Sequence, residues 1–173
     1  ATEVRNTYYQ ALPDIVDHYM QEINKITGKH YAPFNYYGSK KATKVIVAMG
    51  SVTETIKETI DYLIEQGEAV GLVEVHLYRP FSSTYFLKSI PKTVEKIAVL
   101  DRTKEAGATG EPLFLDVASV IKNIDKDIVV VGGRYGLSSK NTTPAMIKAV
   151  YDFLDHPHHP FTIGIEDDVT NLS

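Results

Sequence analysis

The sequence predicts a doubly wound α/β domain, with a mostly parallel five-stranded sheet covered on both faces and one additional N-terminal helix. Short, nearly continuous apolar runs alternate with longer segments whose apolar residues recur every three or four positions. These longer segments are long enough for the crossover helices that join parallel strands. A chain of 173 residues with 43% hydrophobic residues also has the size and composition of a single globular domain.

The N-terminal helix is predicted from one amphipathic face. Its apolar positions are Tyr8, Leu12, Ile15, Val16, Tyr19, Ile23 and Ile26. Pro13 lies near the expected start, where proline is tolerated, and Gly28 is expected to end the helix. The following segment, HYAPFNYYGSKKAT, is expected to be a loop. We therefore divide the chain into residues 1–35, the N-terminal helix and connecting loop, and residues 36–173, the α/β domain.

Five strands and four helices then alternate along the α/β part. Strands are expected at 44–49, 69–77, 96–100, 127–131 and 161–165. The first helix is expected to follow a cap at Ser51 or Thr53 and to end at Gly67. A short helix is expected around 84–88, and longer ones are expected at 113–124 and 144–154. Gly132 and Gly133 are expected to follow the fourth strand and open a loop.

Functional loops in such a sheet lie at the carboxyl ends of the strands. The polar residues that we single out there are Arg79, Asp101, Arg102, Lys104, Glu105, Arg134 and Lys140. In the loop 101–111, Arg102 and Lys104 have the chemistry of a phosphate clamp, and Asp101 or Glu105 that of a buried base. Mutual ion pairing is the favoured interpretation, because no nucleophile, histidine base or metal-ligand spacing accompanies them.

Two glycine-containing turns share some features of phosphate sites. Gly50–Ser51 precedes a helix, and 132–140, GGRYGLSSK, combines glycines with Arg134 and Lys140, but neither matches a phosphate-loop or dinucleotide-binding spacing. A capped strand-to-helix turn is favoured for the first. A structural turn that presents Arg134 and Tyr135 to a neighbour is favoured for the second.

No metal-binding or catalytic residue is predicted from the histidines. His156, His158 and His159 invite a zinc interpretation, but the prolines beside them favour an extended loop without fixed ligand geometry. His76 is expected to be packed or to face a loop. We accordingly assign no catalytic, cofactor-binding or metal-binding residue to this chain.

Charge and cysteine content exclude further classes. The formal net charge of -4 gives no basic excess for nucleic acid, and no apolar run is long enough to span a membrane. The first residues do not form an export signal, so a cytoplasmic location is expected. The chain has no cysteine, which excludes a disulfide, a thiolate zinc site or an ordinary iron–sulfur cluster of its own. The missing initial methionine and the abrupt end at 170–173 suggest an excerpt of a larger multidomain chain.

Five blocks resemble consecutive parts of pyruvate:ferredoxin (flavodoxin) oxidoreductase, in the family's order and spacing. They are YYGSKKATKVIVAMGSVTET (36–55), VGLVEVHLYRPFS (70–82), IAVLDRTKEAGATGEPLFLDV (97–117), VGGRYGLSSKNTTPAMIKAVYD (131–152) and FTIGIEDDVTNLS (161–173). INKITGKHY (23–31) extends the similarity over essentially the whole chain. His76, where the family has arginine, and Ala106, where the family has proline, are minor departures.

The resemblance implies the family's second domain, a module similar to the C-terminal domain of transketolase, with a three-layer α/β/α sandwich. It also implies a whole enzyme that oxidatively decarboxylates pyruvate with coenzyme A, using thiamine diphosphate, magnesium and iron–sulfur clusters. Electrons would pass to ferredoxin or flavodoxin, and the whole enzyme is expected to form homo-oligomers. Those cofactors belong to other domains of the polypeptide, so the isolated segment is expected to be inactive.

Three functional hypotheses follow. The first is a noncatalytic domain of that enzyme, in which the seven polar residues order the strand-end edge and dock it against neighbouring domains. Tyr8, Tyr9, Tyr36 and Tyr37 are expected to add aromatic contacts with another domain. The second is a stand-alone module that binds a nucleotide or a phosphorylated ligand. The third, hydrolase catalysis by the loop 101–111, ranks last because that loop lacks a nucleophile–base pair.

Overall fold

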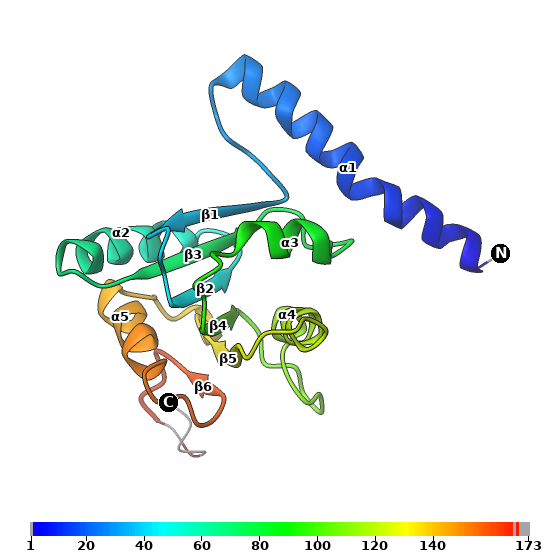
Figure 1. Cartoon of the computed structure of the whole chain (residues 1–173). Helices are drawn as coiled ribbons and strands as arrows, with labels where there is room; N and C mark the ends of the chain where they lie inside the picture. Colours follow the sequence, from blue (N-terminus) through cyan, green and yellow to red (C-terminus); the bar gives the residue numbers. More distant parts are fainter. Residues whose placement is uncertain (1, 168, 170–173) are drawn as a thin grey trace.

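A six-stranded, mostly parallel sheet forms the centre of the protein in the computed structural model, which describes residues 2–167 and 169 (Figure 1). Its strands are β1 (Phe34–Gly38), β2 (Lys44–Ala48), β3 (Val70–Val75), β4 (Lys96–Asp101), β5 (Val129–Arg134) and β6 (Phe161–Thr162). The order across the sheet is β1-β3-β2-β4-β5-β6, and all pairs except β1–β3 are parallel. All five predicted strands are confirmed. The predicted excerpt boundary at 170–173 lies outside the described residues.

Helices cover both faces of the sheet. These helices are α2 (Val52–Glu65), α3 (Ser83–Ser89), α4 (Pro112–Lys122) and α5 (Pro144–Phe153), and a short 3-10 turn, η1, spans Leu137–Ser139. Ile46 of β2 lies in a core cluster with residues of α2 and α5, whereas Val45 and Val47 lie in a second cluster with residues of α3 and α4. Alternating strand residues therefore fill two separate cores, which confirms the three-layer α/β/α arrangement.

Strand β1 is an addition that the sequence analysis missed, since the segment HYAPFNYYGSKKAT was predicted to be a loop. It runs antiparallel to β3, from the pair Phe34↔Val75 to the pair Gly38↔Gly71. Phe34 is buried against Phe81 and Phe86. The ring of Tyr36 occupies the space that a Cβ at Gly71 would take. Aromatic packing onto β3 thus makes this segment a strand, although Pro33 before it and Gly38 at its end are typical of loops.

The prediction that Gly132 and Gly133 open a loop was also wrong, because both lie inside β5. A Cβ at Gly133 would stand 2.2 Å from the ring of Phe161, and one at Gly132 would stand 3.1 Å from Phe114. The glycines therefore let two aromatic rings lie directly on the strand. The longer strand brings Arg134 into register with Asp101 at the end of β4.

Helix α1 (Thr2–Thr27) lies outside the three layers and projects beyond α3 (Figure 1). It begins earlier than predicted, so Pro13 is inside the helix and not near its start. Pro13 is buried, and the Tyr85 hydroxyl of α3 donates a hydrogen bond of 2.8 Å to Asp14. No helix in the described part of the chain has the length and apolar character needed to cross a membrane.

Candidate functional site

The seven predicted residues lie at or after the carboxyl ends of β3, β4 and β5, but the structure separates them into three groups. Asp101, Lys104, Glu105 and Arg134 surround the start of α4. Arg102 and Lys140 line a depression beside the start of α2. Arg79 forms a third group with a residue of α4.

Asp101 connects the end of β4 to the start of α4. Its two carboxylate oxygens accept hydrogen bonds of 3.0 Å each from the backbone N–H groups of Leu113 and Phe114. These donors have no partner within the first turn of a helix, and the N-cap residue Glu111 makes no side-chain cap bond. Burial raises the pKa of Asp101, and the two backbone hydrogen bonds oppose this increase. Asp101 is thus a structural helix cap whose lone pairs are directed inward.

Glu111 is the centre of the same group, although it was not among the predicted site residues. Its side chain is 3% exposed and accepts a hydrogen bond of 2.8 Å from Nε of Arg134. The Nζ of Lys104 lies 3.8 Å away, and the backbone N–H of Glu105 donates to the same carboxylate. Burial, the largest single effect, would raise the pKa of Glu111. The hydrogen bond and charge of Arg134, together with the Glu105 N–H and the Lys104 charge, outweigh burial and lower this pKa. Its position directly before Pro112, the first residue of α4, was the available sequence signal.

Arg79 is held by partners from two elements. Its Nη1 lies 2.6 Å from Asp116 of α4, and its guanidinium stacks 3.9 Å from the ring centre of Tyr78. The Arg79 side chain nevertheless remains 54% exposed. A stacked, oriented guanidinium is suited to contacting a carboxylate or an aromatic ring of a neighbouring surface.

Arg102 and Lys140 lie at a depression of about 190 Å³ beside the first turn of α2. Its lining also includes Ser51, Thr55 and Asn141. Arg102 donates from Nε to the carbonyl oxygen of Gly136 at 3.4 Å. Ser51 occupies the expected N-cap position of α2, but its hydroxyl makes no cap hydrogen bond. The depression is therefore polar and positively charged, with no carboxylate in its lining among the described residues.

The histidines do not form a site in the described part of the chain. His158 and His159 pack around the ring of Phe153, and His158 Nδ1 lies 2.8 Å from the carbonyl oxygen of His156. His76 packs against Tyr31, and its Nδ1 lies 3.1 Å from the carbonyl oxygen of Ala32. Within residues 2–167 and 169, no three His, Cys, Asp or Glu side chains gather where they could hold a metal ion.

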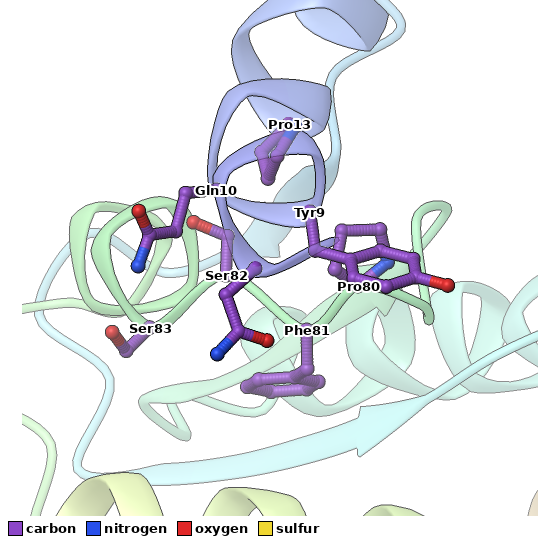
Figure 2. Close-up of a pocket in the computed structure, with 8 residues that line it drawn as sticks. Tyr9, Gln10, Pro13, Pro80, Phe81, Ser82 and Ser83 are labelled. Carbon is purple, nitrogen blue, oxygen red and sulfur yellow. The ribbon is translucent and has the colours of Figure 1, made fainter. Parts of the chain in front are cut away.

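Two clefts separate α1 from the loop after β3. The first, of about 380 Å³, is lined by α1 residues that include Tyr9, Gln10 and Pro13, and by Pro80 to Ser83 (Figure 2). The second, of about 610 Å³, extends past Tyr9 and Leu12 to Arg79 and Asp116. The Arg79 group therefore borders the cleft beneath α1. The predicted aromatic contact residues differ in exposure, since Tyr8 and Tyr9 are 71% and 57% exposed, whereas Tyr36 and Tyr37 are only partly exposed.

Comparisons with known proteins identify the family. The family model described as "Pyruvate:ferredoxin oxidoreductase core domain II" matches residues 42–146. The chain is 53% identical to the pyruvate:ferredoxin oxidoreductase of Moorella thermoacetica and 54% identical to the pyruvate-flavodoxin oxidoreductase of Enterobacter agglomerans. Each alignment covers 99% of this chain and 15% of the relative, so the chain spans about 15% of their length.

A solved structure supports the fold. The protein is 2-oxoglutarate:ferredoxin oxidoreductase from Magnetococcus marinus, determined with 2-oxoglutarate, coenzyme A and succinyl-CoA bound. The similarity covers 76% of this chain and 21% of that chain, with a TM-score of 0.50 and 16% sequence identity. At this identity the likeness concerns the fold alone. From the family model and the two close relatives, the chain belongs to the pyruvate:ferredoxin oxidoreductase core domain II family.

Proposed function

We propose that this chain is a noncatalytic structural and interdomain domain of a pyruvate:ferredoxin (flavodoxin) oxidoreductase. The family match and the 15% share of the relatives' length support a domain within a larger polypeptide. That enzyme would convert pyruvate and coenzyme A to acetyl-CoA and CO2 and pass two electrons to ferredoxin or flavodoxin. The other domains of the same polypeptide are the first partners of this chain.

The observation that carries this proposal is the inward direction of the buried polar groups at the strand-end edge. Asp101 caps α4, and Glu111 is paired with Arg134, so these groups are used to fix the edge. Five other predicted residues have exposed charged side chains: Arg79, Arg102, Lys104, Glu105 and Lys140. A fixed edge with exposed charges of both signs is suited to contacting a complementary protein surface.

The cofactors of the whole enzyme would be held by its other domains. Iron–sulfur clusters need thiolate ligands, and this chain has no cysteine. Thiamine diphosphate is bound with a magnesium ion, which needs carboxylate or carbonyl oxygens around one point. In the described part of the chain, no three His, Cys, Asp or Glu side chains gather where they could hold a metal ion. The residues present therefore do not fit these groups, and we assign this chain no step that uses them.

The proposal is tested by replacing Arg102 and Lys104 together with alanine in the full-length enzyme. If these exposed cations dock against a neighbouring domain, the yield of assembled enzyme and its turnover should fall by roughly tenfold. The matched control replaces Lys40 and Lys41, which are exposed in the loop between β1 and β2 at the opposite edge. Unchanged assembly and turnover in the Arg102/Lys104 variant would refute the role assigned to these residues.

A second candidate is a stand-alone module that binds a nucleotide or another phosphorylated ligand. The depression that contains Arg102 and Lys140 at the start of α2 favours it, because cations and free helix N–H groups attract phosphate. This function requires ligand binding by the isolated chain. The interdomain function requires that the isolated chain neither bind coenzyme A tightly nor oxidise pyruvate.

A further inference from the structure

Helix α1 has one broad apolar face, and only part of it is turned toward the α/β layers. On this part, Pro13 is buried and Leu12, Val16 and Met20 are partly buried. The exposed margin of the apolar face, which we call the outward stripe, consists of Val4, Tyr8, Ile15, Tyr19 and Ile26. Their exposures are 59%, 71%, 49%, 63% and 85%. The apolar spacing that predicted α1 therefore includes residues that the core of this chain does not cover.

The outward stripe runs along most of the helix, and Glu22 interrupts it at one margin. At about 100° per residue, its five positions fall within a band of about 60° around the helix axis. From Val4 to Ile26 it extends for about 33 Å at 1.5 Å per residue. Isolated exposed apolar residues are ordinary, but five exposed apolar side chains aligned over this length are typical of an interaction surface.

The attachment of α1 to the rest of the chain is limited. The Tyr85 hydroxyl donates to Asp14, and Asn24 contacts the backbone of Tyr31 through two hydrogen bonds of 2.8 and 2.9 Å. One cleft of about 380 Å³, drawn in Figure 2, and a second of about 610 Å³ remain between α1 and the loop after β3. Most helical stability in proteins comes from packing of an apolar face, so α1 has much of its stabilising surface still to bury.

We propose that the outward stripe packs into an apolar groove on another domain of the same polypeptide. This proposal rests on the proposed function, because it requires the chain to be one domain of a larger enzyme. The groove should be mainly aliphatic, with hydrogen-bond acceptors at its margins for the hydroxyls of Tyr8 and Tyr19. Helix α1 would then bridge two domains, with Pro13 and its neighbours on one and the outward stripe on the other.

The size of the stripe favours a tethered domain over a second copy of the chain. Its five side chains offer on the order of 500 Å². Stable association of separate proteins buries about 800 Å² on each partner. A domain in the same polypeptide is held at millimolar effective concentration and needs less buried surface. Since the chain spans 15% of its relatives' length, most of such a polypeptide is available to supply the groove.

Amide hydrogen exchange in the full-length enzyme tests this proposal. The test variants are Tyr19→Glu and Ile26→Glu in the outward stripe, and the matched control is Gln10→Glu, an exposed position on another side of α1. All three place the same side chain on one helix. We expect α1 amides to be protected in the parent enzyme and to exchange roughly tenfold faster or more in the two stripe variants. The control and the amides of β2 and β4 should keep their protection.

Each other outcome overturns the proposal. Unprotected α1 amides in the parent enzyme would mean that nothing covers the stripe. If α1 amides exchange equally fast in the Gln10→Glu control, the added charge destabilises the helix wherever it is placed, and the effect is not specific to the stripe. Protection that disappears on dilution, together with a loss of mass in sedimentation, would assign the stripe to a second copy. Failure here is distinguishable from failure of the proposed function, because the Arg102/Lys104 variant tests a different surface.

Discussion

At the scale of single residues, two buried carboxylates organise the edge formed by the carboxyl ends of the strands, and their surroundings shift their pKa values in opposite directions. Asp101 has only neutral backbone donors, and burial raises its pKa. Glu111 is also buried, but the Arg134 guanidinium lowers its pKa. One carboxylate therefore fixes a helix start and the other fixes a strand end. Both act on the positions of the exposed residues around them.

Replacing Asp101 with asparagine should destabilise the fold. The asparagine amide has a single acceptor oxygen, so one of the N–H groups of Leu113 and Phe114 loses its partner. We expect the free energy of unfolding to fall by about 1–2 kcal/mol in urea titrations. Asp125→Asn, at an exposed position in the turn after α4, should change it by less than about 0.5 kcal/mol. Equal effects of the two changes would show that Asp101 is not a cap.

The Glu111–Arg134 pair should make stability depend on pH in the acidic range. The pKa of Glu111 is lower in the folded state than its ordinary value of 4.5, so the folded state binds its proton less tightly. The pair therefore makes its full contribution to the free energy of unfolding above pH 4.5. This contribution is lost as the pH falls through the folded-state pKa of Glu111. At pH 7, Glu111→Gln should lower the free energy of unfolding by roughly 2 kcal/mol. Between pH 7 and pH 3, the variant should lose less stability than the parent protein does.

Unfolding measurements from pH 7 to pH 3 check this expectation, with the exposed Glu95→Gln variant as the control. Other carboxylates also titrate in this range. The informative quantity is therefore the difference between parent and variant in how steeply the free energy of unfolding changes with pH. Parallel curves for the parent and Glu111→Gln would contradict the assigned role of the pair.

At the scale of elements, the parallel strands could be predicted because their valine- and isoleucine-rich runs are buried on both faces. Strand β1 could not, since its partner β3 lies far away in sequence and Gly71 accommodates Tyr36 only once the two are paired. The end of β5 was missed for the same kind of reason, because Gly132 and Gly133 signal a loop until aromatic rings pack on them. Tertiary contacts overrode local signals at both places.

The candidate site, too, could be predicted from the sequence only in part. The sequence pattern located the strand-end edge and the seven polar residues that follow its strands. It could not show that Asp101 and Arg134 are directed inward, because Leu113, Phe114 and Glu111, their partners, become neighbours only through the strand–helix packing. It also could not show that much of the apolar face of α1 stays uncovered, since periodicity indicates amphipathicity and not the partner.

The adjacent glycines of β5 give a prediction for this element. Gly133→Ala should destabilise the fold by roughly 2 kcal/mol, because its Cβ would lie 2.2 Å from the buried Phe161 ring and 2.9 Å from Leu100. Gly132→Ala should cost less than about 1 kcal/mol, because its nearest contact, with Phe114, is 3.1 Å away. Thermal unfolding of the two variants measures this contrast. A larger loss for Gly132→Ala would contradict the packing described for β5 and β6.

At the scale of the whole molecule, a well-packed α/β/α body carries two surfaces that its own core does not use. One is the charged edge after β3, β4 and β5, and the other is the outward stripe of α1. The chain spans 15% of the relatives that it matches at 53% and 54% identity. A domain with a packed core of its own and with exposed surfaces suited to contacting other domains is typical of a part within a larger assembly.

The most direct test of the noncatalytic role is calorimetric titration of the purified chain with coenzyme A, and separately with thiamine diphosphate and magnesium. The full-length enzyme serves as the positive control in both titrations. We predict no saturable heat for the isolated chain and saturable binding by the full-length enzyme. Tight, saturable binding of either compound by the chain alone would contradict the interdomain account and favour the phosphate-binding alternative at the depression that contains Arg102 and Lys140.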